Sequence, residues 1–162
     1  MLSKTIQDAI NTQIQKEFES AYLYLAMAAH YDALSLPGFA SWMRKQFEEE
    51  QGHAFRFYGY VNDQRGRVTL LPIAKPPAEF GKPVEVFQQV LEHEQKVTAS
   101  IKAIYELALK EGDQATQAAL QWFITEQVEE EKNAADLIDQ LKMADQPFGI
   151  LFMDKHVLGA RK

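Results

Sequence analysis

Apolar residues recur at steps of three and four through most of the chain, which is the period of an α-helix. The pattern predicts four long helices, over residues 3–32, about 35–64, 83 to about 111, and about 114–144. A shorter apolar segment, "FGILFMDKHVLG", follows Pro147 and predicts a fifth helix over about 147–158. These helices predict an all-α chain, in which the connection between the second and third helices is partly extended at residues 68–71.

Helix boundaries are marked by proline, glycine and capping residues. Pro37 and Pro83 suit first helical positions, and "EGD" places Gly112 as a C-terminal cap and Asp113 as an N-cap. The proline-rich stretch 65–83 has no helical period and predicts a crossover loop. Two helical hairpins joined by one long connection indicate a four-helix bundle over about 3–144, within a single domain of residues 1–162.

Each apolar stripe is interrupted by polar residues at positions that should be apolar. The interruptions are Glu17 in the first helix, Glu50 with His53 in the second, Glu94 in the third, and Gln127 with Glu130 in the fourth. The spacing repeats, because Gln127 follows Glu94 by the same 33 residues that separate Glu50 from Glu17. This is an internal repeat of polar positions.

The six interruptions are also expected at one height in the bundle. Counted from the turns near Ser35 and Gly112, they fall within about 5 Å of one level, given the helical rise. Any one Glu in an apolar stripe is usually a boundary residue, and a lone His is usually packed or hydrogen-bonded. Because the interruptions of the four stripes share both their spacing and their height, they are not expected to have arisen independently of one another. Glu48 and Glu131, in the two "EEE" runs, are interpreted as solvated.

Four carboxylates at one buried level repel one another and lose their hydration. No Lys or Arg lies in the stripes at that height, so either the carboxyls keep their protons or cations lie among them. Two divalent ions would balance four carboxylates. Oxygen-rich ligation with one imidazole and no thiolate suits iron or manganese better than structural zinc, and Glu50 is the natural bridging ligand.

Composition excludes several classes of protein. The 162 residues contain no cysteine, which excludes disulfides, thiolate metal sites and a cysteine nucleophile. The net charge is −6 and no basic stretch is present, which argues against nucleic-acid binding. No apolar run approaches the length of a membrane span and the start lacks a signal core, so we expect a cytoplasmic protein with no membrane contact.

Together these motifs resemble the bacterial non-haem ferritins over nearly the whole chain. The matching residues are Glu17 with Tyr24, "EEEQGH" at 48–53, Glu94, and "EQVEEE" at 126–131. The resemblance implies an iron-storage protein with ferroxidase activity, which binds Fe(II), oxidises it with O2 and stores Fe(III) as an oxyhydroxide mineral. It also implies self-assembly into a hollow shell of 24 subunits, with the fifth helix packed at the four-fold axes.

The resemblance also implies roles for individual residues. One iron would be held by Glu17, Glu50 and His53, and the second by Glu50, Glu94 and Glu130, with Gln127 nearby. A third iron position would be formed by Glu49, Glu126 and Glu129. Tyr24 would hydrogen-bond or donate electrons at the centre, although an ordinary core tyrosine fits the sequence equally well. Trp122 could pass electrons, but a core tryptophan is the commoner case.

Two sequence differences distinguish this chain from rubrerythrins and bacterioferritins. The fourth helix carries Gln127-x-x-Glu130, whereas rubrerythrins and bacterioferritins carry a second Glu-x-x-His. Gln51 stands where bacterioferritins have their haem-ligating methionine, so no haem is expected. Three alternatives stay open: a di-iron oxidase or oxygenase acting on an organic substrate, a DNA-protecting mini-ferritin, and a metal-free structural bundle.

Overall fold

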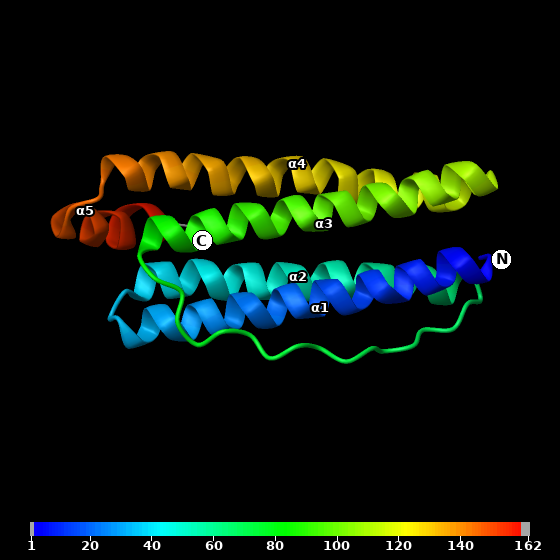
Figure 1. The fold of residues 1–162 in the computed structure, drawn as a ribbon, viewed down its shortest axis with the longest axis horizontal. Helices are drawn as coiled ribbons and strands as arrows, with labels where there is room; N and C mark the ends of the chain where they lie inside the picture. The colour runs from blue at the N-terminus through cyan, green and yellow to red at the C-terminus, as the bar shows by residue number, and fades with distance from the viewer. Residues whose placement is uncertain (1, 160–162) are drawn as a thin grey trace.

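Four long helices form an antiparallel bundle in the computed structural model, which describes residues 2–159. They are α1 (Lys4–Ala33), α2 (Pro37–Asp63), α3 (Pro83–Glu111) and α4 (Gln114–Met143). Figure 1 shows α1 beside α2 and α3 beside α4, with the connection between α2 and α3 running along the length of the bundle. The predicted all-α bundle with a long crossover is therefore confirmed. The predicted domain, 1–162, includes residues 1 and 160–162, which lie outside the described residues.

The helix ends are set by the residues that the sequence marked. The Ser3 side chain accepts a hydrogen bond from the backbone N–H of Ile6, and Asp113 accepts one from Thr116. Pro37 and Pro83 occupy the first positions of α2 and α3, where a missing N–H costs nothing. Gly112 adopts a left-handed conformation with φ of 69°, which lets the chain turn sharply from α3 into α4.

The predicted short C-terminal helix over about 147–158 is confirmed, but its second half is wound as a π-helix. An α-helical turn, α5 (Pro147–Phe152), continues directly into a π-helix, η1 (Met153–Leu158). The π-helix packs against α2, and two of its apolar side chains, Met153 and Leu158, are buried in the core. Figure 1 shows this segment folded back at the end of the bundle, beyond α4. A widened turn of this kind has no signature in apolar periodicity.

The apolar core consists of two clusters, one in each half of the bundle. One contains Tyr24, Trp42 and Phe87, and the other contains Ile10, Phe57 and others. Several polar side chains are buried without belonging to either cluster, namely Gln13, Glu17, Ser20, Gln46, Glu50, His53, Glu94, Gln127 and Glu130. No helix within residues 2–159 has both the length and the apolar character that crossing a bilayer requires.

Candidate metal centre

The six polar residues predicted to share one level are all buried. Their exposed fractions do not exceed 5%, and Glu17, Glu50 and Glu94 are fully inaccessible to solvent. They come from all four long helices, as the repeated spacing predicted. Burial of four carboxyl groups inside one small bundle demands partners for each of them.

Glu17, Glu50 and His53 form the tightest part of the site. One ligand atom from each lies within 4.8 Å of the other two, and His53 Nδ1 is 3.3 Å from Glu50 Oε2. Both oxygens of Glu50 and Oε2 of Glu17 have no hydrogen-bond partner among residues 2–159. Buried carboxylate oxygens without a donor are rare in proteins, and three of them around one imidazole fit a divalent cation of the iron or manganese type.

Glu94 contrasts with Glu50, because both of its oxygens accept hydrogen bonds. The Tyr24 hydroxyl donates a short hydrogen bond to Oε1, and the Gln127 amide donates to Oε2 at 3.0 Å. The same amide also contacts the backbone carbonyl of Glu94 at 3.2 Å. Tyr24 and Gln127 therefore hold the Glu94 carboxyl in one orientation.

Two buried glutamines, which the sequence analysis missed, hold the remaining carboxyls. Gln13 donates from Nε2 to Glu17 Oε1 at 2.8 Å, and Gln46 donates to Glu130 Oε2 at 3.0 Å. Gln13 is itself fixed by Ser100, whose hydroxyl donates to the amide oxygen at 2.6 Å. A signal was present, since Gln13 and Gln46 each lie one turn before a site glutamate and are themselves 33 residues apart.

The pKa values of three of the carboxyl groups, those of Glu17, Glu50 and Glu130, are raised. Burial raises the pKa of Glu17 well above its usual range, and the charge of Glu50 raises it further. The pKa of Glu50 is raised by burial and then by the charge of Glu94. For Glu130, burial and the charge of Glu94 raise the pKa to about 7. The site therefore holds protons that a metal ion can displace.

The other predicted ligands are less closely gathered. Among residues 2–159, Glu17, Glu50 and His53 are the only group of three with metal-ligand spacing. Glu94 on α3 and Glu130 on α4 are buried, and their oxygens accept hydrogen bonds from Tyr24, Gln127 and Gln46. The predicted third position, Glu49 with Glu126 and Glu129, does not form such a group, although Glu126 Oε1 lies 4.0 Å from His53 Nε2.

Two aromatic residues considered in the sequence analysis lie beside the site. Tyr24 is buried, bonded to Glu94, and in edge contact with Trp42 at 6.4 Å between ring centroids. Trp122 is half-buried, with its ring centroid 5.5 Å from that of His53. Tyr24 therefore has a polar role at the centre, and Trp122 touches a predicted ligand.

Comparison with known proteins agrees with this geometry. A family model described as a ferritin-like domain matches residues 7–144. The chain is 41% identical over 161 residues to a bacterial non-heme ferritin of Bacteroides fragilis (strain 638R), covering 99% of this chain and 100% of that protein. It is 35% identical to a bacterial non-heme ferritin of Staphylococcus aureus (strain USA300), covering 99% and 97%.

Solved structures show the same likeness. An open pore ferritin from the hyperthermophilic archaeon Archaeoglobus fulgidus superposes with a TM-score of 0.97 at 41% sequence identity, covering 100% of both chains. A form of that archaeal ferritin engineered to be closed superposes equally well, over 100% of this chain and 99% of the other.

Proposed function

This chain belongs to the ferritin family, and from that premise we propose that it oxidises Fe(II) at the buried carboxylate cluster and stores the ferric product as an oxyhydroxide mineral. Iron storage follows from the family. The observation that supports oxidation within the subunit is the group formed by Glu17, Glu50 and His53, whose carboxyls keep three buried oxygens without a hydrogen-bond donor among residues 2–159.

The proposed ligands divide between two iron positions. Glu17 and His53 bind the first ion and Glu130 and Glu94 the second, with Glu50 bridging the two. Four carboxylates balance the charge of two Fe(II) ions and favour Fe(III) more strongly, because a harder ion gains more from anionic oxygen ligands. The protein thereby lowers the free energy of the oxidised pair relative to the reduced pair.

The chain's own groups have three tasks while dioxygen takes electrons from the two Fe(II) ions. First, the carboxyls release their protons as the ions bind. Gln13 and Gln46 orient Glu17 and Glu130, and Tyr24 with Gln127 orients Glu94. The third iron position, at Glu49, Glu126 and Glu129, belongs to the proposal as a station for iron leaving the centre. Its support is the nearness of Glu126 to His53.

Mineral storage needs an enclosed volume, so we also propose that the chain assembles into a hollow shell of 24 subunits. Apolar side chains on the C-terminal segment support an interface there, because Phe148 is 81% exposed, Leu151 59% and Phe152 52% in the single chain. Exposed apolar groups of this size usually mark a contact between proteins.

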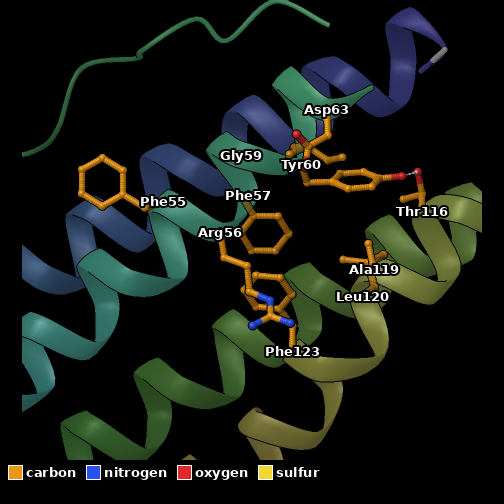
Figure 2. A pocket seen from close by; sticks show the side chains of 11 residues that line it. Phe55, Arg56, Phe57, Gly59, Tyr60, Asp63, Thr116, Ala119, Leu120 and Phe123 are labelled. Atoms are coloured by element: carbon orange, nitrogen blue, oxygen red, sulfur yellow. Dashed lines mark hydrogen bonds between the residues drawn. The ribbon is translucent and has the colours of Figure 1, made fainter. Parts of the chain in front are cut away.

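An oxidase acting on an organic substrate is the competing function, and it needs a cavity that reaches the metal. A groove of about 290 Å³ lies between α2 and α4, lined by Phe57, Tyr60, Phe123 and others (Figure 2). None of the three clustered ligands, Glu17, Glu50 and His53, lines it. Phe57 and Phe123 stack at 3.8 Å between ring centroids. This groove therefore gives an organic substrate no contact with those three ligands.

The test is anaerobic Fe(II) titration followed by rapid mixing with dioxygen. The wild-type protein is expected to bind two or three ions tightly per chain and to oxidise them rapidly. Glu50→Ala should abolish rapid oxidation, whereas Glu48→Ala, at an exposed carboxyl on the same helix, should leave it unchanged. Saturation below one ion per chain, or an unchanged rate in Glu50→Ala, would overturn the proposal. Sedimentation then measures the number of subunits.

A further inference from the structure

An oxidisable side chain beside the centre lies under a cation. Trp122 is in edge contact with His53, and the Arg56 guanidinium lies over the indole, with Cζ 4.1 Å from the ring centroid. Figure 2 shows the same guanidinium beside the ring of Phe123, at the edge of the groove.

Within residues 2–159, no carboxylate pairs with Arg56 and no hydrogen bond joins its guanidinium to another side chain. The guanidinium lies instead against the rings of Trp122 and Phe123. A cation over an indole stabilises the neutral ring through its quadrupole. It repels the positive charge that the ring acquires when it loses an electron.

Loss of an electron from Trp122 is therefore disfavoured. Trp122 has no hydrogen-bond acceptor for its indole N–H among the described residues, so its oxidised ring remains a cation facing Arg56. Metal ions held by His53 add to the same repulsion.

We propose that Arg56 protects Trp122 from one-electron oxidation by the oxidants that form from dioxygen when Fe(II) is oxidised at the centre. Arg56 acts through Trp122 and is a positioning residue. This inference rests on the proposed function for its oxidant, although the effect of Arg56 on the indole does not depend on iron.

The first measurement uses no iron. Trp42→Phe leaves Trp122 as the single tryptophan of the chain. Photo-excited lumiflavin, an uncharged one-electron oxidant, is applied to this parent, and formation of the tryptophan radical is followed by transient absorbance. Adding Arg56→Leu should speed radical formation roughly tenfold, because the repelling charge is gone. Arg56→Lys should stay within about twofold of the parent, because the charge is retained.

Arg44→Leu is the matched control. Arg44 is an exposed arginine on the same helix, paired with Asp32 and 12 residues before Arg56, so its loss changes net charge equally without touching Trp122. Its rate should equal that of the parent. An Arg56→Leu rate within about twofold of the parent, or an equal rise in Arg44→Leu, would overturn the inference.

The second measurement uses Fe(II) and air, followed by peptide mass spectrometry of oxygenated products. Modification of Trp122 should be several-fold greater in Arg56→Leu than in the wild-type protein. Equal modification of Trp122 in the two proteins would overturn the inference. Failure of the proposed function appears separately, as absence of Fe(II) oxidation in the wild-type protein, and leaves the lumiflavin result to decide the effect of Arg56.

Discussion

The carboxylate of Asp154 accepts a hydrogen bond from the backbone N–H of Phe39, with 2.9 Å between Oδ1 and N. Phe39 lies in the first turn of α2, whose own N-cap residue, Leu36, offers no side-chain hydrogen bond. The C-terminal π-helix therefore supplies the cap that α2 lacks, from 115 residues away. Gly38 permits the close approach, because a Cβ there would lie 1.8 Å from the Asp154 backbone oxygen.

Asp154→Ala is expected to lower the free energy of unfolding by about 1–2 kcal/mol, through loss of this cap. Guanidinium denaturation followed by circular dichroism measures the change. Asp154→Asn, which keeps a side-chain oxygen, should lose less. Gly38→Ala should also destabilise the protein, because its methyl group displaces the π-helix. An Asp154→Ala protein as stable as wild type would show that the cap contributes nothing.

Glu50→Met is expected to stabilise the metal-free protein by about 1–3 kcal/mol, because it removes a buried carboxyl whose oxygens have no donor among residues 2–159. Glu94→Met should do the opposite, since it leaves the Tyr24 hydroxyl and the Gln127 amide without their acceptor. Denaturation in the presence of a chelator compares the two. Destabilisation by both substitutions would mean that Glu50 has polar partners in solution.

Metal-free protein is expected to lose stability as the pH rises from about 4.3, the usual pKa of glutamate, to about 7. The pKa of Glu130 is raised to about 7, and those of Glu17 and Glu50 are raised well above their usual range. Over this range the folded chain binds more protons than the unfolded chain, so the free energy of unfolding falls with increasing pH.

Denaturation at a series of pH values measures this slope. Glu130→Gln should make the slope shallower, because the substituted side chain cannot ionise, while Glu17 and Glu50 still contribute. Glu129→Gln, at an exposed neighbour, is the matched control and should leave it unchanged. Stability that rises over the same interval would contradict the raised pKa values.

Gln13→Leu is expected to weaken binding of Co(II), a probe that avoids iron oxidation, by about tenfold. The reason is loss of the amide that fixes Glu17 Oε1. Gln15→Leu is the control, because Gln15 makes the same kind of contact, 3.0 Å to Glu19 one turn later, away from the site. Isothermal titration measures both. Equal affinities of the two variants would exclude a role for Gln13.

The sequence predicted the fold and the layer of polar residues because both depend on spacing alone. Apolar period locates the helices, and equal offsets from two turns bring Glu17, Glu50 and Glu94 to one level. The orientations of the side chains could not be predicted from spacing. Gln46 lies one turn before Glu50 yet donates to Glu130 on another helix, which depends on rotamers that no periodicity records.

The same limit explains two other differences. Four uncompensated carboxylates were expected, but Glu94 is fully hydrogen-bonded and Glu50 is not, because only one of them lies beside Tyr24. The π-helix at Met153–Leu158 and its contact with α2 were not predicted either, because Asp154 and Phe39 meet only after the bundle has formed. Long-range partners of this kind follow from packing.

Glu50 and Glu94 differ in the hydrogen bonds that an incoming Fe(II) ion would have to break. On the proposed ligand set, a first ion finds free oxygens on Glu50 and Glu17, whereas a second must displace a phenol or an amide from Glu94. Occupancy then rises in two steps. When the metal is scarce, most of the occupied subunits would hold one ion, which cannot supply an electron pair to dioxygen. On that ligand set, oxidation would start only above a threshold metal concentration, and iron below it would stay ferrous and exchangeable.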